Sequence, residues 1–315
     1  MFNLVQKRRL FFLISAAVII PGLILMIYST ITTGAPFRLS IDFVGGSIYE
    51  LRFTEPGATE ANIREVFARF EDENVVIQQL GDPGEHRWSV RASFHDAEET
   101  QQIIDALDAL APLDRDSLRQ ETVSATIGQE VTRAAFLAVV VAAVVITGFI
   151  VIAFRKVPNA FRYGVCAVLA MIHDVLVVSA VMSLMGLLFG WEVDALFLTA
   201  LLTVVGFSVQ DTIVLFDRIR ENIPKYLGEP YETIVNRSIL ETIHRSLATQ
   251  LNAFFIMVAI LLFGGETIKQ FIAILFVGLL TGTYSSIFTA VPLLVAWQKG
   301  EIPFVNRKSW AVAEA

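Results

Sequence analysis

Charged residues are scarce in this 315-residue sequence. Asp, Glu, Lys and Arg make up 17% of it, whereas 55% of the residues are hydrophobic and the mean hydropathy is +0.61. A soluble domain typically has about 25% charged residues. The apolar excess must therefore face lipid, and the composition predicts an integral membrane protein.

Cysteine is almost absent as well. The single residue, Cys166, falls within a predicted span, so the sequence has neither a disulfide framework nor the paired spacing of a metal site. No glycine-rich nucleotide loop, metal cluster or hydrolase triad appears, so catalysis is the least favoured class and no cofactor is expected. Residues 32–133 hold 19 acids against nine arginines, a net charge of −10, which excludes nucleic-acid binding there.

Long apolar runs are abundant instead. A bilayer core takes about 20 apolar residues per helix. The first run follows Lys7, Arg8 and Arg9, as a secretory signal peptide would, but its length, Pro21 and the lack of a small-x-small cleavage site favour an uncleaved anchor. Six transmembrane helices are predicted, at residues 10–31, 133–154, 163–189, 195–216, 247–263 and 271–297.

Basic residues gather on one side of these spans. The positive-inside rule places the N- and C-termini in the cytoplasm and sends the acidic segment between the first two spans outside, because the short outer loops keep only Lys269. The predicted organisation is 1–32 for tail and first helix, 33–130 for an extracytoplasmic domain, 131–298 for helices two to six with a cytoplasmic loop at 217–246, and 299–315 for a cytoplasmic tail. The basic residues placed inside are Arg155, Lys156, Arg162, Arg218, Arg220, Lys225, Arg237, Arg245, Lys299, Arg307 and Lys308.

The extracytoplasmic segment predicts a small α+β domain. Alternating apolar residues indicate strands at 47–53, 75–80, 87–94 and 121–127, and amphipathic patterns indicate helices at 59–70 and 97–110. The order βαββαβ is that of a ferredoxin-like unit. His86 and His95 lack the neighbouring carboxylate or hydroxyl groups that catalysis needs, and they are interpreted as surface histidines. The run Glu71-Asp72-Glu73 is interpreted as a solvated helix end.

Ionisable residues inside spans are costly and therefore mark functional candidates. Asp174 follows His173 in the third span, roughly 18 Å from Arg162 at 1.5 Å per residue. Asp211 lies in the fourth span, about 10 Å from Arg218. Arg245 opens the fifth span and could reach Asp211 by extending along a neighbouring helix.

Each candidate has a functional and a structural interpretation. An aspartate beside arginine stays ionised, whereas apolar surroundings favour its neutral form, so Asp211 and Arg245 outline a proton switch. Arg245 is otherwise a boundary cation and Asp211 a helix-packing group. His173 and Asp174 form either a proton relay or a static interhelical pair. Gly278, Gly282 and Ser286 are spaced for close helix packing, and Asp217 and Arg218 read as loop structure.

Three motifs resemble the SecF family of protein-export membrane proteins, in the resistance-nodulation-division superfamily. The first is Ile41-Asp42-Phe43-Val44-Gly45-Gly46, and the last is Gly282-Thr283-Tyr284-Ser285-Ser286-Ile287-Phe288. The middle one is the run Gln210-Asp211-Thr212-Ile213-Val214-Leu215-Phe216-Asp217-Arg218-Ile219-Arg220-Glu221. The resemblance covers nearly the whole chain.

The resemblance implies a bacterial inner-membrane subunit that pairs with SecD, assists the Sec translocon and uses the proton gradient to move unfolded polypeptide. H⁺ would be the coupling ion, carried by Asp211 with Arg245 as its partner. Superfamily members are built of two six-span halves, so a SecD-like partner is implied. The alternatives are half of a small-molecule efflux transporter and a non-transporting scaffold, which proton-flux and pull-down measurements would separate.

Overall fold

The computed structural model describes residues 3–73, 75–155 and 159–301, and the chain forms two compact units. One comprises Leu39–Phe136, and the other Met1–Arg38 together with Leu137–Ala315. Of the basic residues counted for orientation, Lys156, Arg307 and Lys308 lie outside the described residues. Of the predicted cytoplasmic tail, 299–315, only residues 299–301 are described. Lys299 forms an ion pair with Glu232.

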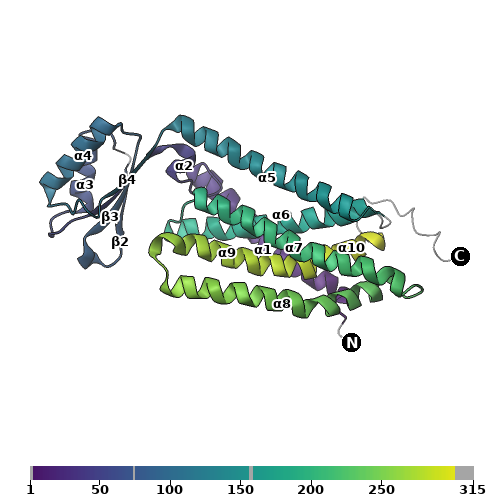
Figure 1. Cartoon of the computed structure of the whole chain (residues 1–315). Coiled ribbons are helices and arrows are strands. Elements are labelled where there is room, and N and C mark those ends of the chain that lie inside the picture. The colour runs from purple at the N-terminus through teal and green to yellow at the C-terminus, as the bar shows by residue number, and fades with distance from the viewer. Residues whose placement is uncertain (1–2, 74, 156–158, 302–315) are drawn as a thin grey trace. The chain divides into compact units, whose positions relative to one another are not determined.

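Six helices are long and apolar enough to cross a membrane, which confirms the predicted number of spans (Figure 1). The first five are α1 (Arg8–Thr33), α5 (Ala125–Ala153), α6 (Ala160–Phe189), α7 (Ala195–Lys225) and α8 (Tyr231–Phe263). A short 3-10 helix, η1 (Val5–Lys7), precedes α1. The sixth span is made of α9 (Glu266–Ser285), a π-helical turn η3 (Ser286–Ala290) and α10 (Val291–Gln298).

The spans divide into an inner and an outer set. In their most apolar windows 56% of α6 and 44% of α7 and of the sixth span is buried, against 11% of α1, α5 and α8. Close packing of α7 on α9 builds the interior: a Cβ on Gly278 would collide with Val204, and one on Gly282 would lie 3.2 Å from Ser208 Cβ. Polar groups on the mutually packed faces of α6, α7 and α9 are therefore shielded from lipid.

The segment predicted as a loop, 217–246, is mostly helical. α7 continues to Lys225 and α8 begins at Tyr231, so only 226–230 lies outside a helix. Charged neighbours one turn apart support the extension of α7, since Arg220 pairs with Asp217 and Arg218 with Glu221. Arg218 also reaches Glu241 on α8 at 2.6 Å, which holds the two extensions together.

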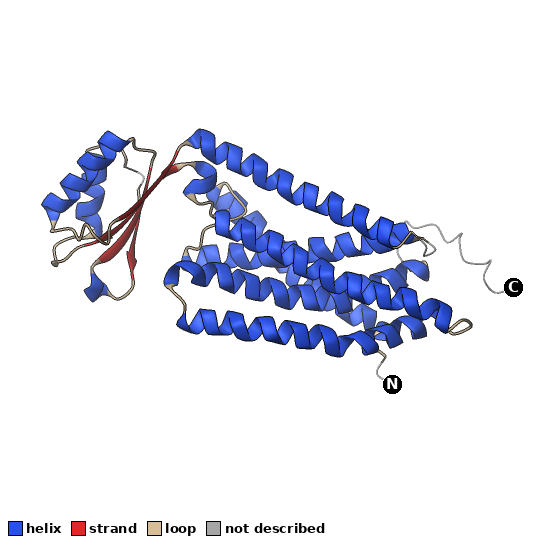
Figure 2. Ribbon diagram, viewed as in Figure 1, coloured by secondary structure: helices blue, strands red, loops and turns tan. Residues whose placement is uncertain are grey.

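The unit Leu39–Phe136 contains a four-stranded antiparallel sheet and two helices on one of its faces (Figure 2). The elements run β1 (Gly46–Arg52), α3 (Glu60–Ala68), β2 (Val76–Leu80), β3 (Arg87–Ala92), α4 (Ala97–Leu110) and β4 (Arg119–Val123). A 3-10 turn, η2 (Pro83–Glu85), joins β2 to β3. The strand order is β2-β3-β1-β4. The core lies between sheet and helices and includes Tyr49, Phe53, Phe67 and Leu107.

Two local predictions in this unit were wrong. His95 is 4% exposed and lies near Tyr49, whose hydroxyl is 3.4 Å from His95 Nδ1. Asp72 is buried too, and accepts the backbone N–H of Ser93 at 2.5 Å. Both residues sit in loops that fold back over the core edge, a placement that strand and helix periodicity does not encode.

The boundary between β4 and α5 also lies earlier than predicted. Residues 125–127 begin α5 instead of ending a strand, and Ser124 Oγ accepts the N–H of Ile127. The neighbouring helix α2 (Ile41–Val44) carries the Asp42 motif. The motif ends at Gly45 and Gly46, whose φ angles are +79° and +126°. A Cβ on Gly45 would come within 2.8 Å of Ala125, so glycine is required by both conformation and space.

Candidate functional site

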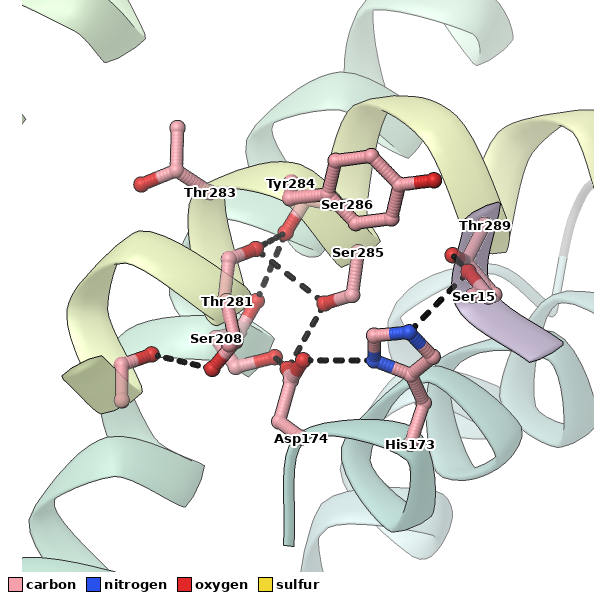
Figure 3. Close-up of polar contacts among 12 residues, drawn as sticks. Ser15, His173, Asp174, Ser208, Thr281, Thr283, Tyr284, Ser285, Ser286 and Thr289 are labelled. Carbon is pink, nitrogen blue, oxygen red and sulfur yellow. Dashed lines mark hydrogen bonds and ion pairs between the residues drawn. The ribbon is translucent and has the colours of Figure 1, made fainter. Parts of the chain in front are cut away.

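Asp174 lies at the centre of a buried polar network in the membrane unit (Figure 3). Its side chain is fully buried on α6, yet three side chains from three helices contact it. Ser208 on α7 and Ser285 on α9 donate to Oδ2 at 2.5 and 2.6 Å. His173, also on α6, places Nδ1 3.0 Å from Oδ1. A carboxylate with so many partners can exist without water.

His173 extends the network to the first span. Its Nε2 is 3.1 Å from Ser15 Oγ on α1, and Ser15 Oγ is 3.5 Å from Thr289 Oγ1 on the π-helical turn (Figure 3). The ring of Tyr284 stacks on the imidazole, with 6.0 Å between centroids. The Tyr284 hydroxyl donates to the Phe11 carbonyl and is not directed at the imidazole. His173 and Asp174 thus have contacts with side chains of three neighbouring helices, α1, α7 and α9.

A second group of hydroxyls lies beside Asp174 between α7 and the sixth span. Thr212 Oγ1 is 3.1 Å from Ser286 Oγ, and both hydroxyls contact the backbone carbonyl of Ser208. All three residues are buried. The narrow α7–α9 spacing set by Gly282 permits these contacts, so the packing motif and the polar network are parts of one arrangement.

Asp211 lies on a different face of α7 and is only partly buried. Gln250 on α8 donates from Nε2 to its Oδ2 at 2.6 Å. Within the described part of the chain, this is the one hydrogen bond or ion pair of the Asp211 carboxyl. Asp211 therefore differs from Asp174, whose two oxygens are both occupied.

The structure does not bring Arg245 to Asp211. Arg245 is exposed on α8, five residues before Gln250, which corresponds to about 7.5 Å along the axis and to another side of the helix. The ion pair considered from the sequence is absent among the residues that the structure describes. Of the other motif residues, Gln210 is exposed, Thr212 is buried, and Asp217 and Arg218 lie on the helical extension of α7.

Sequence reasoning missed four members of the network: Ser15, Ser208, Ser285 and Thr289. Serine and threonine are common in membrane helices, so no single one of them stands out. Two of them could have been found by their neighbours in sequence, because Ser208 lies one turn before the candidate Asp211 and Ser285 lies next to the candidate Ser286. Their meeting around His173 and Asp174 depends on how α1, α6, α7 and the sixth span pack, which residue spacing does not specify.

Comparison with known proteins agrees with the helices and motifs described above. The family model for the C-terminal part of protein export membrane protein SecD/SecF matches residues 102–300, and the SecD/SecF GG motif matches residues 30–56. The protein translocase subunit SecF of Anaerolinea thermophila is 49% identical over 96% of both chains. The chain belongs to the SecF family of protein-export membrane proteins.

Other relatives support the same assignment. SecF of Thermobaculum terrenum is 38% identical over the full length of both chains. The crystal structure of SecDF from Thermus thermophilus, described as a translocon-associated membrane protein, matches with a TM-score of 0.74 and 32% identity. That match covers 95% of this chain and 39% of the SecDF chain. The protein is accordingly a multi-pass protein of the bacterial inner membrane and a SecF-type subunit in protein export.

Proposed function

We propose that this SecF-type subunit pairs with a SecD-like six-span half and uses proton flow through the joined membrane helices to assist movement of unfolded polypeptide through the Sec translocon. Proton binding at Asp211 is the central step. The N- and C-termini lie in the cytoplasm and the α+β unit lies outside. That unit is a ferredoxin-like domain, as its strand order β2-β3-β1-β4 suggests.

The observation that carries this proposal is the exposure of polar residues on the apolar surface of the two contacting helices α7 and α8. Gly206 and Gln210 are exposed on α7, and Thr249 and Asn252 on α8. By helical rise Gln210 lies about 9 Å inside Phe216 and Asn252 about 8 Å inside Leu247, both within the apolar spans. No other described residue hydrogen-bonds the side-chain amides of Gln210 or Asn252.

Amides facing hydrocarbon without partners are unfavourable, so this surface is expected to be covered by protein. Gly206 supports that expectation, because a Cβ there would meet none of the described residues within 4 Å, which leaves room for a second helix. The SecDF structure favours a SecD-like half as the occupant, since this chain matches 39% of that longer one. Asp211 lies at the edge of the same surface, where a proton path between two halves would run.

The proton switch has two states in this proposal. In the state described by the structure, Asp211 is held by Gln250, a neutral donor that suits either form of the carboxyl. In the other, an extended Arg245 follows α8 towards Asp211 and favours the ionised form. Alternation between a neutral and a charged partner would couple proton release to a movement of α8 against α7.

Replacing Asp211 tests the proposal. Asp211→Asn keeps the size and the hydrogen bond with Gln250 but cannot ionise, so the subunit should reach the membrane and co-purify with its SecD partner while proton flux and export assistance are lost. Asp116→Asn, an exposed acid of the outer domain, is the matched control. Normal export by Asp211→Asn in a strain lacking the native subunit would refute the proton switch.

Arg245→Lys separates a specific partner from a boundary cation. Lysine keeps the charge but not the planar donor fork that matches a carboxylate. Reduced proton flux at normal protein level supports the switch with Arg245. Normal proton flux in Arg245→Lys would mean that Asp211 binds and releases protons without Arg245 as its partner. Co-purification of outer-membrane channel components in place of a SecD partner would support the efflux alternative, and absence of any proton flux would support a scaffold.

A further inference from the structure

We propose that His173 and Asp174 form a second proton-binding site, enclosed by α1, α6, α7 and the sixth span and distinct from Asp211. This inference deepens the proposed proton-driven function and rests on it. It assigns chemistry to the most buried acid of the membrane unit, which the switch at Asp211 leaves unused. The site would take up one proton per cycle.

The hydrogen-bond partners are the first argument. A purely structural histidine is usually fixed by a group with one direction of bonding, such as a backbone carbonyl. His173 Nε2 instead meets the Ser15 hydroxyl, which can both donate and accept, and Ser15 in turn meets Thr289, another hydroxyl. Both hydroxyl contacts of Ser15 can therefore reverse their direction when Nε2 gains a proton.

The proton balance follows from that geometry. Before uptake, Nδ1–H of His173 donates to the Asp174 carboxylate and Nε2 accepts the Ser15 hydroxyl. A proton added at Nε2 produces an imidazolium, which now donates to Ser15 Oγ, and Ser15 turns to donate to Thr289. The net charge of the pair changes from −1 to 0, and Asp174 stays ionised between the imidazolium and the two serine donors.

The surroundings are the second argument. Two donors, Ser208 and Ser285, converge on Oδ2, so the negative charge of Asp174 is stabilised where no water reaches it. Among the described residues, no arginine or lysine lies against the pair. The packed elements present Ser15 from α1, Thr289 from η3, and from α9 the ring of Tyr284, whose hydroxyl is bonded to the Phe11 carbonyl. The nearest ionisable group along α7 is Asp211, one turn beyond Ser208, and it is bonded to Gln250.

The site is linked to Asp211 by α7. Ser208 contacts Asp174 from one face of this helix and Asp211 contacts α8 from another. A shift of α7 that follows a change at Asp211 would alter the donors to Asp174 and thereby its hold on the second proton. Ser208 and Ser285 are accordingly positioning residues, because they act on the proton through the carboxylate.

Infrared difference spectroscopy tests this inference on the full-length chain in liposomes, with ring-labelled histidine. On acidification the native chain should show an imidazolium signal that disappears in His173→Gln and in Asp174→Asn and persists in Asp211→Asn. Absence of a signal that depends on His173 over the pH range in which the protein stays folded would overturn the second site.

A pair of adjacent serines keeps the test decisive if the Asp174 variant does not fold. Ser285→Ala removes a hydrogen-bond donor to the Asp174 carboxylate. The carboxylate then depends more on the imidazolium of His173 for its stabilisation, so His173 should bind its proton roughly tenfold more tightly. Ser286→Ala, a buried neighbour whose hydroxyl contacts Thr212 and backbone carbonyls, should change the affinity less than threefold. Equal effects of the two variants would refute the assignment.

The two proposals fail separately. Loss of export in Asp211→Asn together with no titration of His173 would leave the proposed function standing and remove the second site. Titration of His173 together with normal export in Asp211→Asn would show a proton-binding pair that does not drive export through Asp211, and would remove the proposed function.

Discussion

Asp174 and Asp211 are both aspartates within membrane helices, yet their surroundings differ. Asp174 is fully buried and receives contacts from two serines and a histidine, so its environment is completed within this chain. Asp211 is partly buried, contacts Gln250, and borders a surface with exposed amides. One acid is thus enclosed within this chain, whereas the other borders a surface that we propose a second protein covers.

Truncation of each acid should give the largest difference between the two environments. Asp174→Ala removes the acceptor of His173 Nδ1 and of Ser208 and leaves Ser285 with only the Gly282 carbonyl. It should lower the free energy of unfolding by about 3 kcal/mol, since each buried unpaired group costs about 1–3 kcal/mol. Asp211→Ala loses one contact with Gln250 and should cost about 1 kcal/mol or less. Chemical denaturation in detergent measures both. Similar losses would mean that the environments are not distinct.

Two glycines test the same contrast through packing. Gly278→Ala places a methyl group against Val204 in the α7–α9 interface and should cost about 1–3 kcal/mol. The methyl group added in Gly206→Ala would meet no described residue within 4 Å. The isolated subunit should therefore keep its stability or gain up to about 1 kcal/mol, since alanine favours a helix over glycine. The effect of Gly206→Ala is expected on association, measured by co-purification with the SecD partner. A destabilised isolated Gly206→Ala subunit would contradict an open α7 surface.

A partly exposed acid of the α+β unit, Asp108, provides the smallest effect. Asp108 accepts Arg115 Nη2 at 2.8 Å and the Leu113 N–H at 2.9 Å, and these contacts hold its pKa below the ordinary value of 3.8. Because the folded pKa is lowered, the stabilisation is present above pH 3.8 and is lost as the pH falls through the folded value. Asp108→Asn should therefore weaken the unit Leu39–Phe136 by about 0.5 kcal/mol at pH 7.

Hydrogen exchange of α4 amides in the full-length chain measures that difference. The gap between Asp108→Asn and the native chain should close when the pH is lowered well below 3.8. A gap that stays constant over the whole range would show that the asparagine acts on local structure and not through the charge of Asp108.

The hydrophobic periodicity of the sequence and the energetic cost of charge inside a membrane determined the elements of this protein and several of its candidate residues. Apolar runs of spanning length predicted six membrane helices, because no soluble fold can bury so many, and alternation with turn residues predicted the βαββαβ order that the elements follow. The expense of charge inside a membrane was sufficient to single out His173, Asp174 and Asp211. These signals are local or compositional, so the sequence carries them by itself.

Tertiary structure decided which groups meet. The hydroxyls around the pair of His173 and Asp174 come from residues as distant in sequence as Ser15 and Ser285, and their convergence follows from the packing of four spans. Asp211 meets Gln250 in this structure because helix rotation directs that side chain inward and leaves Arg245 exposed. His95 and Asp72 are buried because loops close over a core edge. Such contacts depend on helix rotation and loop path, which a one-dimensional pattern leaves undetermined.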